Sequence, residues 1–312
     1  EGAALPRGVD AVVPLAAGHP SERTVTFIAE ASVGDHVTLA GSIVADGQKL
    51  LASGTILDPR SIALLAEVGL DKVLVRPRPR LVVVSIGAEL VSPGLPITSV
   101  AQHYGASSAL IAASAKADGA TVYPIDHALP DVGGIAQLLS DQLIRSDAIV
   151  VLVESDADAR LICDVLSGLG SCQMGLAGFD GEHVLAVARA GSDRVPVLVL
   201  PGRPVTAFAA YHAFVRPLLD RLGARGAAPA ARTSGVLADD LDADGTGPRF
   251  VPGQLLDDHV VAASGSGAAI DLARADVLVI VPPGAGLKAG SEVECLLLDA
   301  SRAERAAPAA SE

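Results

Sequence analysis

The chain has 312 residues, enough for two or three domains, and 50% of them are hydrophobic. No apolar run of about 18 or more residues is free of charge, so the sequence predicts no membrane span. The net charge is −13 and no Lys/Arg cluster stands out. Because an acidic surface repels polyanions, we predict that neither nucleic acid nor anionic lipid is a partner.

The cysteines Cys163, Cys172 and Cys295 are scattered along the chain and include no C-x-x-C pair. Their odd number and spacing are typical of a reducing compartment. We therefore predict a cytoplasmic location, and neither a disulfide framework nor a zinc site.

Residues 1–45 are predicted to be a β-rich remnant of short strands and glycine turns. Its clearest strand is expected at residues 24–28. The chain begins at Glu1 rather than at Met, so we expect a fragment or a trimmed chain.

Residues 46–78 are predicted to connect this remnant to the rest of the chain through one helix and one short strand. Asp58 can cap the helix, Pro59 suits the first helical position, and Gly69 follows the last turn. The short strand is expected at residues 72–75.

Residues 79–222 are predicted to form the central domain, because strands and helices alternate there. The boundary is marked by Pro77 and Pro79, which stiffen the backbone. Strands are predicted at residues 81–86, 120–125, 148–153 and 195–200, and helices at 106–117, 132–144, 157–169 and 205–222. Continuous apolar strands separated by amphipathic helices indicate an α/β fold with a doubly wound parallel sheet. Residues 172–176 and 183–188 are expected to form an antiparallel insertion.

Residues 232–299 are predicted to form a small C-terminal β-barrel or sandwich. Its strands are expected at residues 236–237, 249–251, 259–262, 276–281 and 292–298. A disordered tail is predicted at residues 300–312.

Ligands of open parallel sheets bind beyond the carboxyl ends of the strands, so the turns there are candidate sites. The first turn contains Gly87, which lets the backbone approach a ligand, and Glu89. Glu89 can bind a metal or act as a base, or it can be a solvated loop carboxylate. Asp126 follows the second strand and can serve as a metal ligand or general base, or cap the next helix.

The turn after the third strand, residues 153–158, carries three carboxylates and no glycine. Two unit charges about 6 Å apart repel by roughly 3 kcal/mol at an effective dielectric of 20, so phosphate would need Mg²⁺ to bind there. A capped helix start is the favoured interpretation. The fourth turn comprises Pro201, Gly202, Arg203 and Pro204. It is rigid, allows close approach at Gly202, and offers Arg203 to an anion.

Several segments are similar to motifs of one known family. Residues 2–13 look like TGAPLPxGADAVV, residues 79–90 like PRVAxxSTGDEL and residues 201–205 like a PGNPV turn. Residues 289–293 lie in a segment similar to the family's last domain. Together these segments resemble the molybdopterin molybdenumtransferase family, which includes MoeA and the gephyrin E-domain.

The resemblance implies insertion of molybdate into adenylylated molybdopterin, with Mg²⁺, by a cytoplasmic homodimer. It implies catalytic roles for Glu89 and Asp126 and a metal-binding role for Glu89. Gly87 and the turn of Pro201, Gly202, Arg203 and Pro204 would bind the substrate.

Other family positions differ in this chain. Ala88 replaces the aspartate of GDEL, and residues 105–107 replace a D-S-N triplet. The 153–158 turn replaces the GGVSxGxxD loop, residues 175–179 replace KPGKP, and residues 41–44 replace GEDI. We expect the family's N-terminal arm to be missing from this chain. Two hypotheses follow: a transferase with a degraded pterin and phosphate pocket, or a non-catalytic relative that acts as a dimeric scaffold or regulatory binding module.

Overall fold

The computed structural model describes residues 2–28, 30–178, 182–225, 231–242, 248–256, 260–263, 268–284 and 286–298. The chain divides into two units, residues 1–74 and residues 75–312. The predicted tail at 300–312 lies outside the described residues, and so does Phe179 of the 175–179 segment. The finer division into five segments stays a prediction.

The first unit contains little regular structure. Strand β1 (Gly18–Pro20) follows a 3₁₀ turn, η1 (Leu15–Ala17), and pairs antiparallel with β2 (Val25–Phe27). Helix α1 (Pro59–Glu67) begins where the sequence predicts, because the Asp58 carboxylate accepts a hydrogen bond from the Ser61 amide at 2.8 Å.

The strand predicted at residues 72–75 is wrong: these residues are described and have no regular structure. A strand needs a neighbour for its backbone groups, and these four residues pair with none of the described strands. None of the described residues of the first unit is buried.

The central sheet has six strands. Their order is β6 (Thr121–Ala128), β3 (Arg80–Ile86), β7 (Ala148–Val153), β10 (Val195–Pro201), β9 (Glu182–Ala190) and β8 (Gly170–Gly178). The first four run parallel, whereas β9 runs antiparallel to both of its neighbours, β10 and β8. The predicted α/β fold with a parallel-rich central sheet is therefore confirmed, and the predicted antiparallel insertion forms one edge of this sheet.

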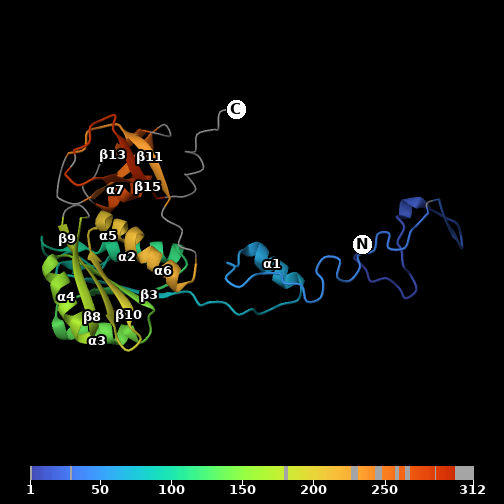
Figure 1. The fold of residues 1–312 in the computed structure, drawn as a ribbon, viewed down its shortest axis with the longest axis horizontal. Helices are drawn as coiled ribbons and strands as arrows, with labels where there is room; N and C mark the ends of the chain where they lie inside the picture. The colour runs from blue at the N-terminus through green and yellow to red at the C-terminus, as the bar shows by residue number, and fades with distance from the viewer. Residues whose placement is uncertain are drawn as a thin grey trace. The chain divides into compact units, whose positions relative to one another are not determined.

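Helices cover both faces of this sheet (Figure 1). On one face, α3 (Val132–Leu143) and α4 (Asp156–Leu169) bury a cluster that includes Val82 and Val84 of β3. On the other face, α2 (Ala106–Ala117), α5 (Pro204–Ala210) and α6 (Arg216–Leu222) bury a cluster that includes Leu81 and Val83. Successive residues of a strand point to opposite faces, so both must be apolar when both faces are covered.

The last helix of this domain is not continuous. The sequence predicts one helix at 205–222, but a π-helical turn, η2 (Tyr211–Val215), separates α5 from α6. Single π-helical turns often mark functional or strained positions in helices. His212 lies in this turn.

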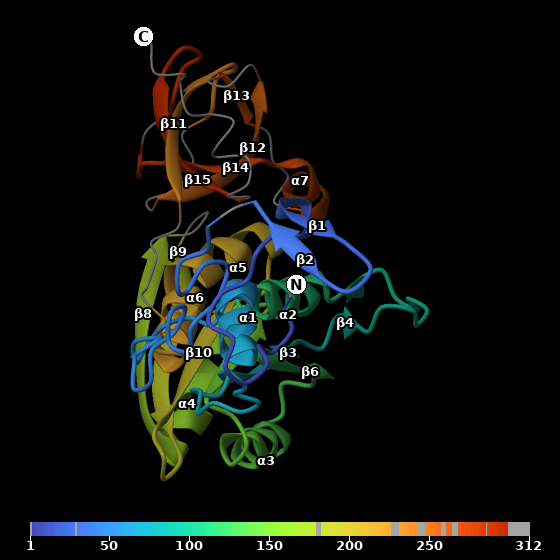
Figure 2. The same cartoon turned by 90° about the vertical axis from the view of Figure 1, so that its right-hand side faces the viewer.

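The C-terminal strands close into a barrel in the order β11 (Arg232–Leu237), β13 (Val260–Ala263), β12 (Arg249–Leu256), β14 (Val277–Val281) and β15 (Glu292–Leu297). Figure 2 shows this ring with the short helix α7 (Ala269–Arg274), which the sequence does not predict, beside it. Val261, Val277 and Cys295 are among its fully buried residues. The predicted barrel is confirmed. None of the helices in the described part of the chain is long and apolar enough to cross a bilayer.

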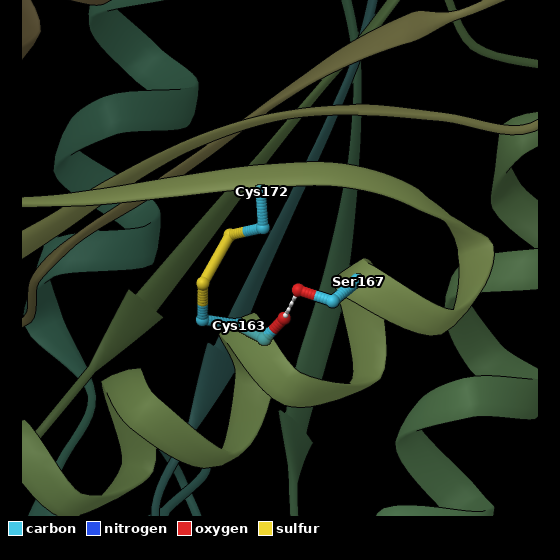
Figure 3. Close-up of a disulfide and its surroundings, with 3 residues drawn as sticks. All are labelled: Cys163, Ser167 and Cys172. Atoms are coloured by element: carbon cyan, nitrogen blue, oxygen red, sulfur yellow. Dashed lines mark hydrogen bonds between the residues drawn. A yellow bond between two sulfur atoms is a disulfide. The ribbon is translucent and has the colours of Figure 1, made fainter.

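The prediction against disulfides is wrong. Cys163 of α4 and Cys172 of β8 form one, with 5.9 Å between their Cα atoms (Figure 3). The chain reverses between α4 and β8, which brings two cysteines that are nine positions apart within bonding range. Cys295 is a free buried thiol, and burial raises its pKa to about 11.

Candidate functional site

Three strands end level with one another at the carboxyl edge of the sheet. Val153 of β7 pairs with Ile86 of β3 on one side and with Pro201 of β10 on the other. The next residue of each strand is therefore Gly87, Glu154 or Gly202. The register thus brings the first, third and fourth predicted turns together, with Glu154 in the middle.

A cavity of about 310 Å³ lies at this edge. Its lining comprises Val153, Glu154, Ser155, Asp156, Val184, Pro201, Gly202 and Arg203. Three of the predicted substrate-binding residues, Pro201, Gly202 and Arg203, thus share one cavity. Pro204 begins α5 beside this lining, and Gly87 is buried on the other side of Glu154.

The 153–158 turn is the capped helix start that the sequence favours. Ser155 caps α4: its Oγ accepts a hydrogen bond from the Asp158 amide at 3.1 Å and donates one to Asp158 Oδ2 at 2.7 Å. Asp156 Oδ1 accepts a hydrogen bond from the Val184 amide of β9 at 3.2 Å. Asp156 and Asp158 therefore have structural contacts within the fold. Their negative charges are also favourable at the N-terminus of α4, where the helix dipole is positive.

The side chain of Glu154 lies between two glycines. A Cβ atom on Gly87 would come within 2.8 Å of Glu154 Cγ, and one on Gly202 would overlap Glu154 Oε1. The sequence predicts that these glycines let a ligand approach the backbone. In the structure, the group that approaches both of them is the Glu154 side chain of the same chain.

His103 holds the other end of this carboxylate. Its Nε2 lies 3.3 Å from Glu154 Oε2. His103 belongs to strand β5 (His103–Tyr104), which pairs in parallel with β4 (Leu90–Val91) just after Gly87. Sequence reasoning missed this histidine, because no spacing or motif links it to a glutamate 51 positions away.

The turn of residues 201–204 has few backbone donors for an anion. Pro201 and Pro204 have no N–H group, and the Gly202 amide donates to Val153 O at 2.7 Å. Ser107 Oγ donates to the Gly202 carbonyl. Three of the four residues of this turn therefore offer no free amide to a ligand. A phosphate site built on backbone amides needs more than one.

Of the two predicted catalytic carboxylates, Glu89 is not among the described residues that line the cavity. Glu89 is exposed in the turn after β3, where its carbonyl accepts a hydrogen bond from the His103 amide at 3.0 Å. Asp126 lies inside β6 instead of beyond the strand, because β6 extends to Ala128; its side chain is outside what the structure describes. Helix α3 is capped by Asp131, whose carboxylate accepts from the Gly134 amide at 2.6 Å.

Among the described residues, no three His, Cys, Asp or Glu side chains are grouped so that they could hold a metal ion. Magnesium prefers several oxygen ligands in near-octahedral geometry. The described surroundings of Glu89 do not offer such a set, so the described residues do not fit the Mg²⁺ that the resemblance implies.

Comparison with known proteins identifies the family. Residues 1–69 match the model of the MoeA N-terminal region (domain I and II), and residues 234–298 match that of the MoeA C-terminal region (domain IV). Molybdopterin molybdenumtransferase 1 of Mycobacterium tuberculosis is 32% identical over 305 residues, covering 91% of this chain and 69% of that protein. This chain belongs to the MoeA family.

Other MoeA relatives agree. Molybdopterin molybdenumtransferase 2 of Mycobacterium tuberculosis is 33% identical over 226 residues, and the match covers 70% of this chain and 55% of that protein. The crystal structure of the molybdopterin biosynthesis MoeA protein of Pyrococcus horikoshii superposes with a TM-score of 0.76 at 25% identity. It covers 95% of this chain and 73% of that one. The resemblance drawn from the turns is thus confirmed at the level of the family.

Proposed function

We propose that this chain acts on molybdopterin in molybdenum cofactor biosynthesis, with the cavity beside β7 and β10 as its substrate pocket. The name of the relative that is 32% identical over 91% of this chain supports the substrate class. The position of the cavity at the carboxyl edge of the sheet supports the pocket. Its volume of about 310 Å³ is within the range of small-molecule sites.

The proposed reaction is the insertion of molybdate into adenylylated molybdopterin. Arg203 would meet an anionic group of the substrate, and Gly87 and Gly202 would border it. Glu89 and Asp126 are the proposed catalytic carboxylates. We derive no step through Mg²⁺, because the described residues offer no set of ligands for it.

The second candidate function is a non-catalytic dimeric scaffold or regulatory binding module, in which molybdopterin would bind weakly or not at all. The observation that favours it is the Glu154 side chain, which takes up the space between Gly87 and Gly202. The scarcity of amide donors in the 201–204 turn also favours this second function, because it weakens the binding of an anionic ligand.

Calorimetric titration with molybdopterin and with its adenylate separates the two functions. Micromolar or tighter binding by this chain would rule out the scaffold. A reconstitution assay for molybdate insertion extends the test, because a scaffold gives no turnover at any concentration.

A matched pair of variants tests the proposed pocket. Arg203→Gln should weaken molybdopterin binding about tenfold, because an arginine–anion contact contributes on the order of 1.5 kcal/mol. Arg189→Gln removes the same charge from an exposed position of β9 that pairs with Pro196, at the opposite end of β10 from the cavity. Equal effects of the two substitutions would contradict the pocket.

We also propose that the chain works as a homodimer. None of the described residues of the first unit is buried, and large apolar side chains such as Leu15 and Val33 are more than four-fifths exposed. A segment without a core cannot offset its chain entropy alone, so it needs another surface, which a second copy can supply. Light scattering tests this proposal: the expected mass is twice the 31.3 kDa of one chain. A monomer at micromolar concentration would contradict it.

The proposed location is the cytoplasm, where we expect the Cys163–Cys172 pair to be largely reduced. Alkylation of thiols in intact cells tests this. Complete protection of both cysteines would contradict a cytoplasmic location.

A further inference from the structure

Glu154 occupies the central one of three aligned positions at the carboxyl edge of the sheet, between Gly87 and Gly202. Its side chain is only 18% exposed, although it lines the cavity at this edge. The Cγ atom lies against Gly87 and Oε1 lies against Gly202, so the side chain spans the distance between the two turns. Glu154 thus forms one wall of the pocket, and its carboxylate gives that wall a negative charge.

We propose that Glu154 blocks the anion-binding end of this pocket and so sets which ligands the pocket accepts. A phosphate group would need the space beside Gly202 that the carboxylate fills, and it would also meet the repulsion of a like charge. Arg203 lines the same cavity and brings a positive charge to it. The identity of the natural ligand rests on the proposed function, whereas the block itself depends only on contacts within this chain.

His103 is the positioning residue for Glu154. The carboxylate uses both oxygens: Oε1 faces Gly202, and Oε2 accepts from His103 Nε2 at 3.3 Å. The backbone of His103 is itself held, because its amide donates to the Glu89 carbonyl at 3.0 Å. Without the imidazole, the carboxylate can turn toward solvent and leave the space beside Gly202 open for part of the time.

Titration of the full chain with inorganic pyrophosphate tests the block. Glu154→Ala should bind pyrophosphate at least tenfold more tightly than the unmodified protein, and Glu154→Gln should gain less because the amide still fills the space. Asp164→Asn is the matched control: it removes one carboxylate from an exposed position of α4 outside the cavity lining, and its affinity should not change. The block is overturned if folded Glu154→Ala, checked by circular dichroism, gains nothing, or if Asp164→Asn gains as much.

The positioning role of His103 has its own readout. His103→Ala should gain part of the affinity of Glu154→Ala, and the double variant should bind no more tightly than Glu154→Ala alone. Gains that simply add would show that His103 does not act through Glu154.

Parallel titration with molybdopterin separates this inference from the proposed function. A gain for pyrophosphate in Glu154→Ala without any binding of molybdopterin supports the block and overturns the proposed function. Equal, tight binding of molybdopterin to the unmodified protein and to Glu154→Ala supports the proposed function and overturns the block.

Discussion

His212 lies in the π-helical turn between α5 and α6, where its ring is packed among other rings. The ring centroids of Phe208 and Tyr211 lie 4.6 Å and 5.4 Å from that of His212, both in edge-on geometry. Neither ring nitrogen has a hydrogen-bond partner among the residues that the structure describes. Burial, assisted by the charge of Arg216 and opposed by Asp118, lowers the pKa of His212 to about 4.

This lowered pKa makes the stability of the fold depend on pH. In the unfolded chain the pKa of a histidine is about 6.5, so the unfolded state takes up the proton first as the pH falls. The free energy of unfolding therefore decreases between the two pKa values and is highest above the unfolded value. Between about pH 7 and about pH 4.5, a folded pKa of about 4 corresponds to a loss of roughly 2.5 kcal/mol.

Urea unfolding followed by far-ultraviolet circular dichroism at these two pH values measures the loss. Carboxylates also titrate in this range, so the quantity of interest is the difference between the unmodified protein and His212→Phe. That variant keeps an aromatic ring beside Phe208 and removes the titrating group. The unmodified protein should lose roughly 2.5 kcal/mol more than the variant. Losses that agree within about 0.5 kcal/mol would refute the argument, because His212 would then titrate alike in both states.

Three other substitutions or treatments have consequences that denaturation can measure. Reduction of the Cys163–Cys172 disulfide should lower the free energy of unfolding by roughly 2.5 kcal/mol, because the bond closes a short loop of the unfolded chain. Gly202→Ala should lower the free energy of unfolding by about 1 kcal/mol, because the new Cβ overlaps Glu154 Oε1. The loss should be smaller when Glu154→Ala is also present. Ser155→Ala removes the side-chain cap of α4 and should cost about 1 kcal/mol.

Each of these has a control within the chain. Cys163→Ser should show the lower stability without any further response to reductant, and an unmodified protein that ignores reductant would contradict the disulfide. If Gly202→Ala lowers the free energy of unfolding equally in the unmodified protein and in Glu154→Ala, the loss does not come from contact with Glu154. Ser155→Thr keeps a hydroxyl that can cap α4. If it lowers the free energy of unfolding as much as Ser155→Ala does, the loss does not come from the cap.

The candidate site was predictable wherever it depends on the general rule for parallel sheets. Gly87 and the turn of residues 201–204 follow apolar runs, and ligands of such sheets bind at the carboxyl ends of strands. His103 was not predictable, because a two-residue strand 51 positions from Glu154 gives no periodic signal. Asp126 shows the uncertainty of strand ends: β6 continues to Ala128, so a residue placed beyond the strand lies inside it.

The sequence by itself determined the local elements and the family. Apolar runs such as that of β3, and the Asp58 cap before Pro59, act through neighbours in the chain and are therefore visible in the sequence. Only the tertiary structure decided that Cys163 meets Cys172 and that Glu154 fills the space between two glycines. Those contacts depend on strand register and on where the chain reverses, and the packing of distant segments sets both.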